Sequence, residues 1–77
     1  QPVIYQFPLI LESGEAITDL DGDARLLNVP VGGLTPVPGD TMRFSWSETD
    51  WRVISRVWDT TAAGGMLKLV LRPLQEV

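Results

Sequence analysis

Glycine and proline divide the chain into short segments. Seven glycines and six prolines are spread over 77 residues, and both residue types weaken helices and strands at interior positions. Between them lie stretches in which polar and apolar residues alternate with a period of two, as in a half-buried strand. The range 15–20 is long enough for one helical turn but too short for a stable helix. These features predict an all-β fold with at most one short helical turn.

The most regular alternation lies in the second half of the chain. The range 41–46 is expected to be a strand with Met42, Phe44 and Trp46 on one face. A four-residue turn, 47–50, connects it to a second strand over 51–58, so that the two form a hairpin. Strict alternation divides this second strand into a core face of Trp51, Val53, Ser55 and Val57 and an opposite face of Arg52, Ile54, Arg56 and Trp58.

Three further strands complete the expected sheet. The range 3–11 is rich in β-forming residues, but Pro8 cannot donate to a ladder, so this is an edge strand or one interrupted near its middle. A shorter strand covers 24–31. A last strand covers 66–72, with Leu67, Leu69 and Leu71 facing the core. A chain of this length forms one domain, which we expect over 1–77 as a five-stranded, strongly bent antiparallel sheet or small barrel.

The order of these segments is similar to a known group of small barrels. Five short strands, with Pro38-Gly39-Asp40 just before the third and two consecutive hairpins after it, resemble the Sm-like domains over roughly residues 3–74. The resemblance implies a small barrel that assembles into rings and binds RNA through loop residues.

The composition excludes most enzyme chemistry. The chain has no histidine and no cysteine, which excludes the catalytic triad, the cysteine–histidine pair and thiolate zinc sites. We therefore expect a non-enzymatic protein without a cofactor or metal. The acidic run 19–23 is similar to the start of an EF-hand loop, but Ala24 and Pro30 stand where that loop needs glycine and glutamate. A turn in which aspartates accept backbone hydrogen bonds is the favoured interpretation, with a weak calcium site as the alternative.

Charge is distributed unevenly. The first forty residues contain six acidic residues and one arginine, whereas the remainder contains five basic and four acidic residues, for a net charge of −4. Net acidity disfavours general nucleic-acid binding. Strand alternation nevertheless predicts one basic and aromatic stripe on the last hairpin, which we name as the candidate interaction surface: Arg52, Arg56, Trp58, Lys68 and Arg72.

The predicted stripe places like charges opposite one another. If Trp58 pairs with Met66, Arg56 faces Lys68 and Arg52 faces Arg72, which is destabilising. Either the register shifts by two residues or an anion lies there. The anion is expected to be the acidic segment 12–23 of the same chain or of a neighbouring subunit, with a phosphate backbone and a solvated face as alternatives.

Tryptophan supplies the largest apolar side chains. We expect Trp46 and Trp51 to fill the core, and Trp58 to contribute either to the core or to a contact surface.

These expectations lead to three functional hypotheses. The first is an interaction module that self-associates, as a homo-oligomer, or docks to a protein partner. The alternatives are an Sm-like RNA- or DNA-binding domain that uses the basic stripe, and a small structural subunit of a larger particle. The N-terminal residues have no basic region before an apolar run and no range is long enough to span a membrane, so a cytoplasmic location is expected.

Overall fold

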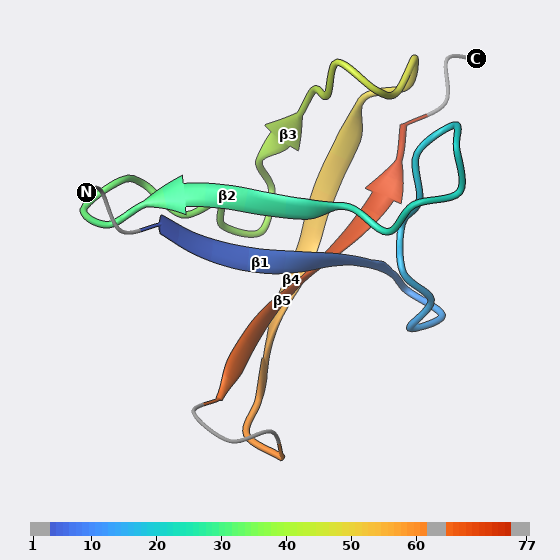
Figure 1. Ribbon diagram of the computed structural model, residues 1–77. Coiled ribbons are helices and arrows are strands. Elements are labelled where there is room, and N and C mark those ends of the chain that lie inside the picture. The colour runs from blue at the N-terminus through green and yellow to red at the C-terminus, as the bar shows by residue number, and fades with distance from the viewer. Residues whose placement is uncertain (1–3, 62–64, 75–77) are drawn as a thin grey trace.

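The fold is a single, strongly curled sheet of five strands (Figure 1). The computed structural model describes residues 4–61 and 65–74, and within these ranges it contains no helix. The strands are β1 (Ile4–Leu11), β2 (Leu26–Pro30), β3 (Thr41–Met42), β4 (Trp51–Asp59) and β5 (Met66–Pro73), in the order β2-β1-β5-β4-β3. The all-β prediction is confirmed, and the sheet is an open half-barrel whose edge strands are β2 and β3. No helix that could cross a membrane occurs in the described ranges.

One strand pair differs from the expected antiparallel arrangement. Leu9 to Leu11 of β1 pair in parallel with Leu69 to Leu71 of β5, whereas the other three pairs are antiparallel. Parallel neighbours need a long crossover connection, and here β2, β3 and β4 all lie between the two strands in the chain. The sheet is therefore mixed.

Pro8 marks the point where β1 changes its partner. Residues Ile4 to Pro8 pair with β2, and Leu9 to Leu11 pair with β5. Proline has no backbone N–H to donate, so it is tolerated where one ladder ends and the next begins. The strand is thus continuous, and the β1–β2 and β4–β5 pairs diverge on either side of a short contact (Figure 1).

The core lies where these two strand pairs cross. Its buried members are Leu9, Ile17, Val53, Leu69 and Leu71. Burial of one such side chain stabilises the fold by about 1.5–3 kcal/mol. Half-buried side chains pack around this cluster, including both tryptophans predicted for the core: Phe7, Leu11, Leu27, Met42, Phe44, Trp46 and Trp51.

The first strand of the predicted 41–58 hairpin is much shorter than expected. Only Thr41 and Met42 pair with β4, so the connection to β4 spans 43–50 instead of four residues. Side-chain interactions stabilise this longer connection. The Ser47 hydroxyl accepts a hydrogen bond from the Trp51 indole at 3.0 Å, and Arg43 forms a bidentate ion pair with Asp50.

A β-bulge at Ile54 reverses the faces of the second half of β4. Val53 is opposite Leu71, but Ser55 is opposite Val70, so one extra residue is accommodated between them. Beyond the bulge, Arg56 is opposite Leu69 and Trp58 is opposite Leu67, on the concave face, while Val57 is opposite Lys68. The prediction that Val57 faces the core is therefore wrong, and this side chain is exposed.

Candidate functional site

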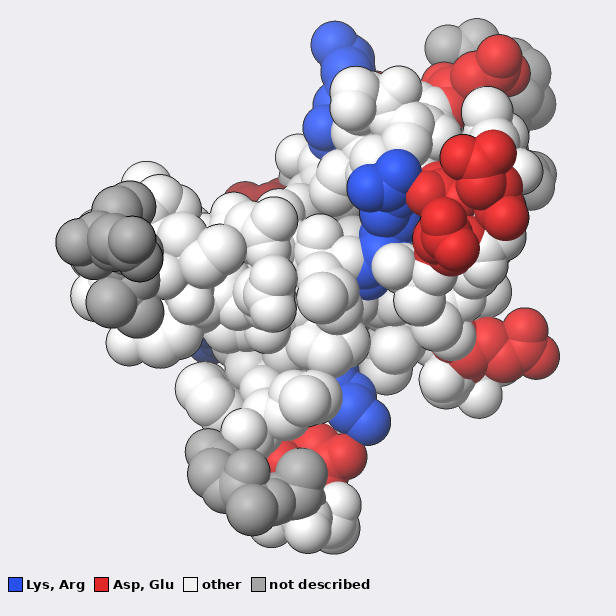
Figure 2. Space-filling model, in the orientation of Figure 1, with Lys and Arg blue, Asp and Glu red and all other residues white. Residues whose placement is uncertain are grey.

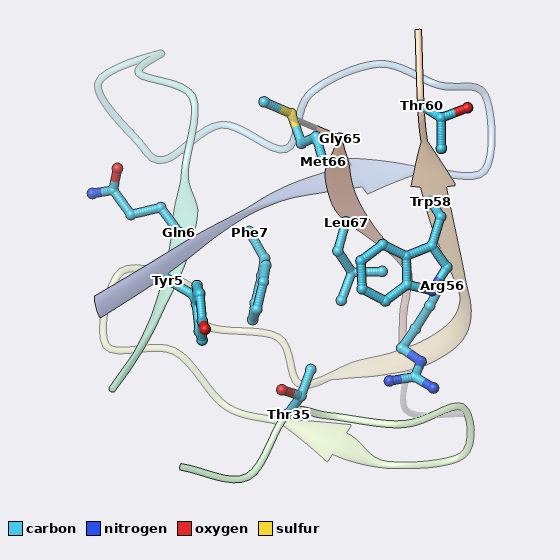
Figure 3. A pocket seen from close by; sticks show the side chains of 10 residues that line it. All are labelled: Tyr5, Gln6, Phe7, Thr35, Arg56, Trp58, Thr60, Gly65, Met66 and Leu67. Atoms are coloured by element: carbon cyan, nitrogen blue, oxygen red, sulfur yellow. The ribbon is translucent and has the colours of Figure 1, made fainter. Parts of the chain in front are cut away.

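An open groove lies between the first half of β1 and the outer half of the β4–β5 pair (Figure 3). Its volume is about 710 Å³. The divergence of β1 from β5 opens this space, because the two strands pair only at Leu9–Leu11 and Leu69–Leu71. The groove is lined by Tyr5, Gln6, Phe7, Thr35, Arg56, Trp58, Thr60, Gly65, Met66 and Leu67.

Aromatic rings form two sides of the groove. On β1, the rings of Tyr5 and Phe7 are stacked with their centroids 6.1 Å apart. On β4, Trp58 is 67% exposed, and its cross-strand neighbour, the buried Leu67, contributes to the floor. Large apolar side chains that remain exposed in a concavity are typical of a binding surface.

Among the described residues, Arg56 is the one charged residue that lines the groove (Figure 3). Within the described ranges no carboxylate lies within ion-pair distance of its guanidinium, although four other basic residues have such partners. The groove therefore combines apolar walls with a cation that has no acidic neighbour among the described residues. This combination suits a ligand with an apolar group next to a carboxylate or phosphate.

The structure divides the predicted basic stripe between two faces. Arg52 and Arg72 are directly opposite each other, as the alternation predicted. The prediction that Arg56 and Trp58 share a face with Lys68 is wrong, because the bulge at Ile54 turns them to the concave side. The five residues of the predicted stripe therefore do not lie on one face of the sheet.

Acidic residues of the same chain neutralise two members of the stripe. Arg72 forms a bidentate ion pair with Glu12, with Nε–Oε1 and Nη2–Oε2 distances of 2.7 and 3.0 Å. Lys68 lies 3.0 Å from Asp59. Hydrogen bonds from the Thr61 hydroxyl, the Lys68 ammonium and the Thr61 amide lower the pKa of Asp59 to about 2. The intramolecular explanation for the stripe is confirmed for Arg72, whose partner lies in the acidic segment 12–23.

The acidic run 19–23 forms an ordered turn at the tip of a small hairpin. One carboxylate oxygen of Asp19 accepts hydrogen bonds from the amides of Asp21 and Asp23 at 2.9 and 3.0 Å, and the other oxygen pairs with Arg25. Burial by itself would raise the pKa of Asp19, but the two amides and Arg25 more than offset it, so the pKa is lowered. Gly22 has a φ of 85°, which favours glycine. The interpretation as a hydrogen-bonded turn is confirmed.

This turn is attached firmly to the sheet. Ile17, just before it, is buried in the core, and its amide donates to the carbonyl of Leu9 at 2.9 Å. The amide of Arg25, just after it, donates to the carbonyl of Ile17 at 2.9 Å. The tip between them exposes 90% of Leu20.

Sequence reasoning missed the β1 side of the groove. Tyr5 and Phe7 are two residues apart, so strand alternation places them on one face, which is a signal that was present. Thr35 lies in a loop, and no local pattern predicts that it lines the groove. Of the predicted residues, Arg56 and Trp58 belong to the groove, whereas Arg52, Lys68 and Arg72 do not line it.

The groove lining consists of apolar, aromatic and uncharged polar residues around Arg56. Among the described residues, no histidine, cysteine, aspartate or glutamate lines it. Within residues 4–61 and 65–74, no group of three or more potential ligands of these types is placed to hold a metal ion.

Comparison with protein-family models, curated proteins and solved structures finds no match for this chain.

Proposed function

We propose that this protein is a non-enzymatic docking module, whose groove binds a protruding apolar side chain and an adjacent carboxylate of a protein partner. The observation behind this proposal is the composition of the groove: Trp58 is largely exposed beside the Tyr5–Phe7 stack, and Arg56 has no carboxylate within ion-pair distance among the described residues. Tryptophan, tyrosine and arginine are the residues enriched at energetically important positions of protein interfaces.

The outer half of the β4–β5 pair supports the same function. Beyond Val53, no described strand pairs with β4 on its β3 side, and β1 does not pair with the residues of β5 before Leu69. An isolated two-stranded ribbon is only marginally stable in water, so a partner that packs against it would stabilise it. Trp58 lies in this ribbon.

An Sm-like nucleic-acid-binding role has less support. It would use a continuous basic stripe, but Arg72 and Lys68 are paired with acidic residues and Arg56 faces another side of the sheet. The net charge of −4 also repels polyanions. The proposed likeness to Sm-like domains is therefore limited to two features. These are the curled, five-stranded sheet and the association with proteins.

A selection of displayed random peptides tests the proposal. The wild-type protein should enrich peptides in which a large apolar residue neighbours aspartate or glutamate. Binding of these peptides should weaken about tenfold or more in the Trp58→Ser variant, because the main apolar wall is lost. The Val57→Ser variant is the matched control, since Val57 is exposed on the opposite face of the same strand.

Two results would contradict the proposal. One is a set of selected peptides whose affinity is the same for wild type and Trp58→Ser. The other is preferential binding of a short single-stranded RNA that weakens steeply as salt rises, which is the signature of phosphate contacts.

A further inference from the structure

We infer that the partner of the groove is a second copy of this chain, which inserts the tip of its acidic hairpin, Leu20 with Asp21, against Trp58 and Arg56. This inference rests on the proposed docking function and names its occupant. It follows from three properties of the tip: shape, charge and position.

The tip presents the side chain that the groove requires. Leu20 is 90% exposed. Removing such an apolar side chain from water is favourable in free energy. The adjacent Asp21 has no basic residue within ion-pair distance in the described ranges. An exposed leucine next to an unpaired carboxylate therefore complements an apolar groove that contains an unpaired arginine.

The tip is also held in a fixed shape before any contact. The amides of Asp21 and Asp23 donate to Asp19, the amide of Gly22 donates to the carbonyl of Asp19 at 3.1 Å, and that of Asp19 to the carbonyl of Asp23 at 3.0 Å. A preorganised loop loses little conformational entropy when it binds. The buried Ile17 anchors this loop to the core.

The tip and the groove border different hollows of one molecule. Leu20 lines a smaller hollow together with Trp46 and Trp51. None of the residues that line this hollow lines the groove. In Figure 2 most acidic side chains gather on one side of the molecule, others lie at its lower end and behind its upper edge, and much of the opposite side is uncharged. Because the tip does not line the groove of its own molecule, we infer that the two surfaces meet between copies.

Such a contact is head-to-tail, because each copy uses its tip on one neighbour and its groove on another. Contacts of this kind form closed rings or open filaments. One tip in one groove covers less than the roughly 800 Å² per partner of a stable interface. We therefore expect weak association, visible at high micromolar concentration, unless several contacts close a ring.

Sedimentation velocity of two variants, alone and mixed, tests the inference. Leu20→Ser removes the tip and Trp58→Ser removes the groove wall, and both positions are exposed enough to leave the fold intact. Wild type should sediment faster as its concentration rises, whereas each variant alone should remain monomeric. An equimolar mixture should form a dimer and nothing larger, because one tip and one groove remain active. Leu34→Ser, at an exposed leucine outside the groove lining, should associate like wild type.

A charge exchange provides a second test. Asp21→Arg and Arg56→Asp should each weaken association about two- to fivefold, as expected for an exposed ion pair. A chain that carries both changes should associate as strongly as wild type.

Three outcomes would overturn the inference. They are a wild type that is monomeric up to its solubility limit, a Leu20→Ser variant that associates as wild type does, and a mixture that remains monomeric. If the chain is monomeric but Trp58 is still required for peptide binding, only the identity of the partner is wrong. If Trp58 is required neither for self-association nor for peptide binding, the proposed function fails as well.

Discussion

At the scale of single residues, Ile54 determines which side chains enter the groove. Alternation along β4 is strict up to Val53, and the extra residue at Ile54 then moves Arg56 and Trp58 to the concave face. A register change of one residue turns every following side chain to the other face of a strand. Without the bulge, Val57 would occupy the position opposite Leu67 and the groove would have neither its arginine nor its tryptophan.

Core leucines make the largest single contributions to stability. Leu69 is completely buried and lies at the centre of the crossing between the two strand pairs. We expect Leu69→Ala to lower the free energy of unfolding by about 2–5 kcal/mol through lost burial and the cavity that remains. Urea denaturation measures this difference. Val57→Ala, at an exposed position, is the control, and equal losses in the two variants would contradict the assignment of the core.

The Asp59 carboxylate should titrate near pH 2. Its pKa is lower in the folded chain than the usual value of about 3.9. The ionised carboxylate therefore stabilises the folded state fully at pH values above about 3.9. This contribution is lost as the pH falls through about 2. Carbon-13 NMR of the carboxyl group measures the pKa, and Lys68→Gln should raise it. An unchanged pKa in that variant would show that the 3.0 Å ion pair does not form in solution.

At the scale of elements, the sequence predicts strands well and their pairing less well. All five strands lie within the predicted ranges or within one residue of them, because alternation and Gly/Pro interruptions are local signals. The partner change at Pro8, the parallel pairing of β1 with β5 and the bulge at Ile54 depend on contacts between distant segments. The groove arises from these long-range features, so only its β4 residues were predicted.

The connection 43–50 depends on one hydroxyl group. Ser47 Oγ accepts hydrogen bonds from the Trp51 indole and the Thr49 amide, and donates to the Thr49 carbonyl. We expect Ser47→Ala to destabilise the protein by about 1 kcal/mol or slightly more, because the half-buried indole loses its acceptor. Thermal unfolding checks this, with the exposed Ser45→Ala as control. An identical melting temperature for both variants would contradict the role of this hydroxyl.

At the scale of the whole molecule, two strand pairs are joined at one short crossing. The core occupies this crossing, while the outer half of the β4–β5 pair extends beyond it and forms one side of the groove. The core and the proposed docking surface therefore lie in different parts of the sheet. The outer ribbon has few buried side chains, which is usual for regions of low local stability.

Native-state hydrogen exchange should show this division. The amides of Leu69 to Leu71, which lie between two paired strands, should exchange only on global unfolding. Amides in the outer ribbon, such as that of Val57, should exchange much faster. Uniform protection along β4 and β5 would mean that the outer ribbon is as stable as the core.

The most direct test of the docking surface uses the three tryptophan side chains. Their indole N–H groups give separate signals in a proton–nitrogen NMR spectrum. We predict that the Trp58 signal shifts as protein concentration rises or as a selected peptide is added. The Trp46 and Trp51 signals, which come from side chains packed against the core, should stay in place when the peptide is added. A ligand that binds, or a chain that associates, while the Trp58 signal remains unchanged would show that the groove is not the docking surface.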